Sequence, residues 1–177
     1  MKTPFPTRKL TSAGLLLALA VLLPAVVHMT SLAGGGKVLL PMHLPVLFGG
    51  FLLGPVGGAL LGLVSPALSF LLIGMPTAAL LPYQTCELVG YGFMAGLLFH
   101  FLRGRKGGIP LTLVGAMLFG RFLNAAALLT ASELFGQAVT VTAVVAAAVT
   151  GALGILIQLI VLPPVVYAIE RSGYFDT

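Results

Sequence analysis

The sequence predicts an all-α integral membrane protein that forms a single transmembrane domain over residues 1–177. Hydrophobic residues make up 59% of the chain and charged residues only 7%, whereas a soluble domain carries about 25% charged residues. The apolar segments do not alternate polar and apolar residues, as the strands of a membrane barrel would, so we expect helices. The single cysteine, Cys86, excludes an internal disulfide and a cysteine-only metal site.

Five apolar stretches are long enough, or nearly so, to cross a bilayer. A helix needs about 20 residues to span a hydrocarbon core roughly 30 Å thick. The first stretch follows a basic N-terminal segment, as the core of a secretory signal would, but its length favours a retained helix. The predicted helices comprise residues 10–28, 56–73, 81–102, 109–130 and 141–169.

A sixth apolar stretch, residues 42–53, is shorter than a usual span. Basic residues near span ends prefer the cytoplasm. The N-terminal cluster of Lys2, Arg8 and Lys9 and the "RGRK" cluster, residues 103–106, can both lie inside only if an even number of crossings separates them. The short stretch makes that number even. The sequence therefore predicts six transmembrane helices, with both termini cytoplasmic and a Gly-Pro turn after residue 53.

The net charge of +5 comes mostly from these two basic clusters. It therefore indicates membrane topology, and we expect no nucleic-acid partner. Small residues spaced four apart let helix backbones approach closely in lipid. Two such series occur, one across the predicted turn and one in the fourth helix: Gly50, Gly54, Gly58 and Gly62, and Gly92 and Gly96.

Polar residues within the spans are the candidate functional residues, because ionisable groups at membrane depth are costly. Glu87 lies six residues into the helix 81–102. Arg121 and Asn124 share a face of the next helix at a similar depth in the outer half of the bundle. One interpretation is a structural ion pair between Glu87 and Arg121, since a buried charge must be paired. The other is that one or both charges hold a polar ligand, and the two interpretations are compatible.

Five further side chains complete the predicted substrate-binding site. Tyr91 shares a helix face with the carboxylate of Glu87. The others stand near the outer ends of spans or inside the last one: Tyr83, Gln84, His43 and Gln158. An outward-facing histidine can equally be a solvated helix cap. Since no two histidines have i, i+4 spacing, the sequence predicts no helix-borne metal site.

The stretches "HLPVLFGGFLLGPVGGALLGLVSPALSFLLIGMP", "LPYQTCELVGYGFMAGLLF" and "MLFGRFLNA" resemble the substrate-binding S components of energy-coupling factor (ECF) transporters. The likeness is closest to the branch of folate, pantothenate, pyridoxine and cobalamin binders. The resemblance implies six helices, with both termini inside and a vitamin bound near the outer face. It also implies delivery by a separate module, made of a transmembrane coupling subunit (EcfT-like) and two ATPase subunits.

Small residues on the first helix serve as the docking surface in that family, and Gly14 and Ala18 have the matching spacing. The sequence contains no phosphate-binding loop. We therefore expect that ATP is used only by the partner ATPases and that no cofactor is bound for chemistry. Two alternatives are a stand-alone secondary carrier and an integral membrane enzyme. With only four acidic residues and no nucleophile beside a base, we expect no enzyme activity.

Overall fold

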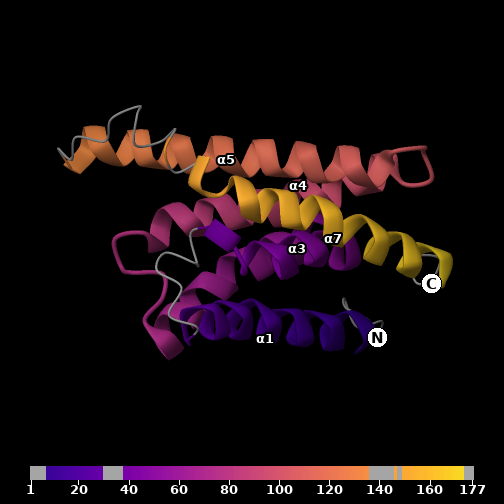
Figure 1. Ribbon diagram of the computed structural model, residues 1–177, viewed down its shortest axis with the longest axis horizontal. Coiled ribbons are helices and arrows are strands. Elements are labelled where there is room, and N and C mark those ends of the chain that lie inside the picture. Colours follow the sequence, from indigo (N-terminus) through magenta and orange to yellow (C-terminus); the bar gives the residue numbers. More distant parts are fainter. Residues whose placement is uncertain (1–6, 30–37, 136–145, 147–148, 174–177) are drawn as a thin grey trace, which may run out of the picture.

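The computed structural model describes residues 7–29, 38–135, 146 and 149–173. Its helices run side by side in a bundle (Figure 1). Within the described ranges, five helices are long and apolar enough to cross a membrane. They are α1 (Thr7–Met29), α3 (His43–Ile73), α4 (Leu81–Leu102), α5 (Gly108–Phe135) and α7 (Ala152–Arg171).

The helix α3 reverses direction at Gly54, where the backbone is non-helical, with φ 81° and ψ −175°. Residues eight apart in a straight helix lie about 12 Å from each other along the axis. Here a Cβ atom added at Gly58 would lie only 2.7 Å from Cα of Gly50. The two halves of α3 therefore pack against each other, and the break lies at the predicted Gly-Pro turn.

Glycine allows the helices α3 and α4 to approach backbone to backbone. A methyl group at Gly62 would overlap the backbone of Leu88, and one at Gly92 would overlap the backbone of Gly58. A methyl group at Gly50 would lie 2.6 Å from the carbonyl oxygen of Gly92. The close packing predicted from the four-residue spacing is thus confirmed, and it aligns the two halves of α3 with α4.

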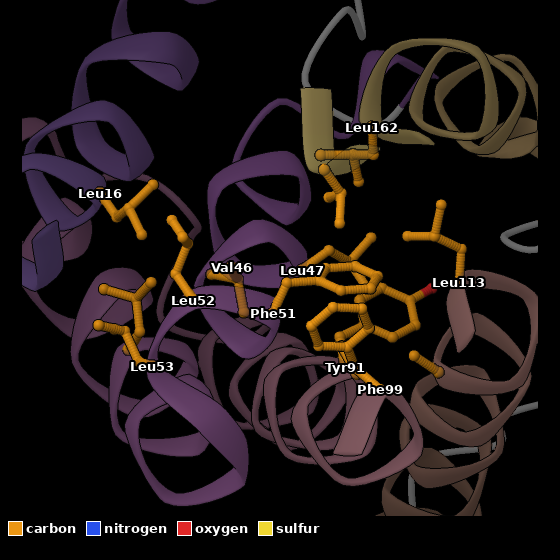
Figure 2. Close-up of a cluster of buried hydrophobic side chains, with 14 of the residues drawn as sticks. Leu16, Val46, Leu47, Phe51, Leu52, Leu53, Tyr91, Phe99, Leu113 and Leu162 are labelled. Carbon is orange, nitrogen blue, oxygen red and sulfur yellow. The ribbon is translucent and has the colours of Figure 1, made fainter. Parts of the chain in front are cut away.

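The apolar core lies between α1, α3, α4, α5 and α7 (Figure 2). The rings of Phe51 and Phe99 form an edge-to-face pair, with centroids 5.0 Å apart and planes at 71°. Large apolar side chains also lie exposed on every described spanning helix, for example Leu15, Leu71 and Leu118. In a membrane protein these exposed side chains face lipid.

The observed bounds follow the predicted ones closely except at two helices. The helix α4 has the predicted bounds, whereas α5 continues to Phe135, beyond the predicted end at residue 130. The helix α7 begins at Ala152, after a turn at Gly151. The predicted last span began at residue 141, and residues 136–145 and 147–148 lie outside the described part of the chain.

Candidate functional site

The carboxylate of Glu87 is the centre of a buried polar cluster. The helix α4 begins at Leu81, so Glu87 stands within its second turn, and only 4% of the residue is exposed. Its Oε1 lies 3.2 Å from Nε of Arg121 on α5 and 3.5 Å from Nε2 of His43 at the start of α3. Its Oε2 accepts a hydrogen bond of 3.0 Å from Nδ2 of Asn124. Three helices thus converge on one carboxylate, and the predicted meeting of Glu87, Arg121 and Asn124 is observed.

The amide of Asn124 also ties α5 to the beginning of α4. Its Nδ2 donates to the backbone carbonyl of Tyr83 at 3.3 Å. Tyr83 and Gln84 are both half-buried, and the Gln84 amide contacts Sδ of Met42 at 3.9 Å. Tyr83 therefore enters the cluster through its main chain, whereas the sequence singled out its side chain.

His43 and Tyr91 form an aromatic wall of the cluster. Their rings make an edge-to-face contact, with centroids 5.1 Å apart and planes at 65°. Tyr91 is completely buried, and 2% of His43 is exposed. A methyl group at Gly120 would overlap the Tyr91 ring, so glycine on α5 makes room for it. The interpretation of His43 as a solvated cap is wrong, because the reversal of α3 places its first turn inside the bundle.

Gln158 lies against the segment that precedes α3. Its side chain is buried, and Nε2 donates to the carbonyl oxygen of Leu40 at 3.4 Å. Leu40 has a positive φ of 48°, which is uncommon for a residue with a side chain. Its carbonyl also accepts the backbone N–H of His43 at 3.0 Å. Gln158 thus connects α7 to the turn that positions His43.

Two glycines near the start of α7 belong to the site and were not predicted. A methyl group at Gly151 would overlap Nη2 of Arg121, and one at Gly154 would lie 2.7 Å from the carbonyl oxygen of Leu39. The absence of side chains there lets the guanidinium and the segment 38–40 approach α7. The spacing of Gly151 and Gly154 on one helix face was an available signal, but it pointed only to close packing.

Several buried donors and acceptors of the cluster are left without a hydrogen bond. One carboxylate faces a guanidinium, an imidazole and an amide. Nε and Nη2 of Arg121, both ring nitrogens of His43, Oε1 of Glu87 and the Tyr91 hydroxyl are buried, yet within the described chain they make no hydrogen bond of good geometry. Buried polar groups are normally hydrogen-bonded. About 20% of the Arg121 side chain is exposed, so the cluster can be reached from outside the core.

The cluster lies at one end of the bundle, and the main basic residues lie at the other. The starts of α3 and α4 and the later part of α5 form the end that carries Glu87 (Figure 1). The beginning of α1, the loop 103–107 and the end of α7 form the opposite end. The Glu87 cluster can therefore hold a polar molecule near one face of the membrane.

The predicted docking residues Gly14 and Ala18 both lie exposed on α1. An added Cβ at Gly14 would meet no atom within 4 Å. Leu16 and Ala20 on the same helix are buried. The small residues therefore lie on the face of α1 that the described chain leaves uncovered.

Comparison with known proteins identifies the family. The family model described as "ECF transporter, substrate-specific component" matches residues 8–166. No curated protein and no solved structure matches the chain. The family and the apolar helices make this a multi-pass protein of the prokaryotic plasma membrane. The chain belongs to the family of ECF transporter substrate-specific components, and it is a transporter subunit rather than an enzyme.

Proposed function

We propose that the protein captures a small water-soluble vitamin or cofactor precursor at the outer membrane face and delivers it inward with an ATP-driven coupling module. The observation that carries this proposal is the buried cluster around Glu87, in which several polar atoms are left without a hydrogen bond. A purely structural ion pair between Glu87 and Arg121 would be expected to have its hydrogen bonds satisfied internally. The unsatisfied nitrogens suit a ligand that brings acceptors of its own.

Each residue of the cluster takes a role that follows from its chemistry. Arg121 holds a carboxylate or phosphate of the substrate, because a guanidinium presents two parallel donors to such groups. Glu87 and Asn124 bond hydroxyl groups or ring nitrogens of the substrate. Tyr91 and His43 offer ring faces for an aromatic or heterocyclic substrate.

The polar residues at the edge of the cluster mainly determine the shape of the substrate site. Gln158 and Gln84 fix the segments before α3 and at the start of α4 through their contacts with Leu40 and Met42. Tyr83 stands one turn before Glu87, near the mouth of the cluster. These residues set the size of the substrate that the site admits.

The proposed topology has six crossings, with both termini cytoplasmic. The reversal of α3 at Gly54 supports two crossings within that helix. The basic residues at the start of α1, in the loop 103–107 and at the end of α7 lie at one end of the bundle, which supports a cytoplasmic assignment of that end. The cluster around Glu87 then faces outward.

The proposed partners are a transmembrane coupling subunit and two ATPase subunits. Docking through the small-residue face of α1 is supported by the exposure of Gly14 and Ala18. Small residues at this spacing allow a partner helix to approach the backbone closely. ATP hydrolysis in the partner module would then drive release of the substrate inside.

The first test is mass spectrometry of small molecules released from gently purified protein. We expect a stoichiometric vitamin or precursor. The Arg121→Ala variant should not retain this molecule, because it lacks the guanidinium that neutralises the carboxylate or phosphate of the substrate. The Arg171→Ala variant removes an exposed arginine at the opposite end and should retain it. Equal retention by both variants would contradict the role of Arg121, and failure to bind any vitamin offered would contradict vitamin capture.

A further inference from the structure

A second polar site lies at the end of the bundle opposite the Glu87 cluster. A hollow of about 430 Å³ opens between the loop that joins α4 to α5 and the last turns of α7. Figure 1 shows that this loop and the C-terminal end of α7 share one end of the molecule. The residues that line the hollow and carry the argument are Arg103, Arg105, Lys106, Ile109, Tyr167 and Glu170.

The hollow carries a positive charge. Nε of Arg103 lies 3.7 Å from Oε1 of Glu170, so the carboxylate is already balanced by one guanidinium. Arg105 and Lys106 are both exposed at the same hollow. Among the described residues that line the hollow, three basic side chains face one carboxylate, which leaves two net positive charges. Such a site attracts an anion that carries about two oxygen acceptors or more.

The loop holds its two basic residues in a defined place. Gly104 and Gly107 have φ values of 75° and 77°, which glycine adopts without strain. The N–H of Arg105 donates to the carbonyl of Leu102 at 3.1 Å, and the Arg105 carbonyl accepts the N–H of Gly108 at 2.9 Å. The tight loop therefore presents Arg105 and Lys106 beside the first turn of α5, whose N-terminal end adds a partial positive charge.

Apolar side chains lie at the hollow and next to it along the chain. Leu102 and Ile109 line it. Phe101 and Leu111 stand close to it in sequence on α4 and α5, and they are 64% and 60% exposed. A basic site at the end of exposed apolar helices lies at the depth of lipid headgroups. The hydroxyl of Tyr167, which is 41% exposed, suits the same interface.

We propose that this hollow binds the phosphate of an anionic phospholipid, with the acyl chains lying along the exposed apolar faces of α4 and α5. Arg105 supplies a fork of donors to the phosphate oxygens, and Lys106 supplies a point charge. The exposed apolar side chains of Phe101 and Leu111, close to the hollow in sequence, favour a lipid over a soluble anion. The site lies on the face that we propose to be cytoplasmic, where anionic lipids attract basic residues.

The test is native mass spectrometry of the full chain from vesicles of phosphatidylglycerol and phosphatidylcholine in equal amounts. The wild-type protein should retain phosphatidylglycerol in preference to phosphatidylcholine. The Arg105→Gln/Lys106→Gln variant should bind it roughly 30-fold more weakly, because two charges near an anionic surface are removed. The matched control is Lys9→Gln/Arg171→Gln, which removes two positive charges at the same end of the bundle and should change retention little.

Two results would overturn the proposal. Equal loss of phosphatidylglycerol from both double variants would show general attraction to the basic end instead of a site. Displacement of the lipid from wild-type protein by a modest excess of inorganic phosphate would show that a soluble anion is the better ligand. Circular dichroism of each variant should show the helical content of the wild-type protein. A loss of lipid binding can then be attributed to the site and not to unfolding.

Discussion

Glu87 illustrates how a single residue organises the site. Its carboxylate receives contacts from His43 on α3, Arg121 on α5 and Asn124 on the same face of α5. Each contact joins α4 to another helix, so the residue has a structural consequence in addition to its proposed role in binding. The two roles are compatible, because a ligand can take over donors that the carboxylate leaves unsatisfied.

The coupling of Glu87 and Arg121 can be measured by a double-mutant cycle. We expect Glu87→Gln to lower the stability of the purified protein by about 1–3 kcal/mol, since it leaves a partly exposed guanidinium beside a neutral group. The Glu87→Gln/Arg121→Gln variant should lose less than the sum of the single variants. Thermal unfolding in detergent, without added ligand, provides the measurement. Additive losses would contradict a direct interaction between the two side chains.

His43 shows a limit of prediction at the residue scale. Its sequence position at the start of an apolar stretch is compatible with a solvated cap or with a ligand contact. The structure buries it against Tyr91 and within 3.5 Å of Glu87. Nothing local determines this outcome, because it depends on where the other helices lie around the first turn of α3.

At the element scale, the bounds of α4 follow directly from hydropathy and from the proline near its start. The break at Gly54 also follows from the Gly-Pro pair. The extent of α5 and the start of α7 do not, because the alanine- and valine-rich sequence between residues 125 and 150 offers little periodic signal. Helix ends in such sequence are decided by packing and by backbone hydrogen bonding.

The reversal within α3 depends on glycine at residue 54. Its φ of 81° and ψ of −175° lie in a region that is open essentially only to glycine. We expect Gly54→Ala to destabilise the protein by about 1–3 kcal/mol through backbone strain alone. Gly14→Ala, in an exposed helical position with open space around it, is the control and should not destabilise the fold. Unfolding temperatures that do not differ between the variants would contradict strain at this turn.

At the scale of the whole molecule, the distribution of charge predicts the membrane orientation. In a Cys86→Ala background, we expect Lys106→Cys to react with an impermeant thiol reagent only from the cytoplasmic side. Thr77→Cys, in the turn between α3 and α4, should react only from outside. Both positions are exposed. Labelling of the two from the same side would contradict six crossings with cytoplasmic termini.

The proposed docking face of α1 leads us to expect that a substitution there separates substrate binding from transport. We expect Gly14→Leu to leave the fold and substrate binding unchanged, because a Cβ added there meets no atom of the described chain within 4 Å and the residue is exposed. It should reduce ATP-dependent uptake in vesicles that contain the coupling module. If the leucine weakens the contact between α1 and the coupling subunit by about 1–2 kcal/mol, their association becomes roughly 5- to 30-fold weaker.

Ala168→Leu, at an exposed position of α7, is the matched control and should transport normally. Equal uptake by both variants would contradict docking through α1. Uptake by the wild-type protein without the module or ATP would instead favour a stand-alone carrier.

The sequence by itself determined the membrane class, most helix bounds and the shared depth of Glu87, Arg121 and Asn124. Hydropathy, helix rise and glycine spacing are local quantities, and they can be read along the chain. Only the tertiary structure decided the burial of His43, the contact of Gln158 with Leu40 and the proximity of Gly151 to Arg121. These depend on the rotation of each helix about its axis, which side-chain packing among all the helices determines together.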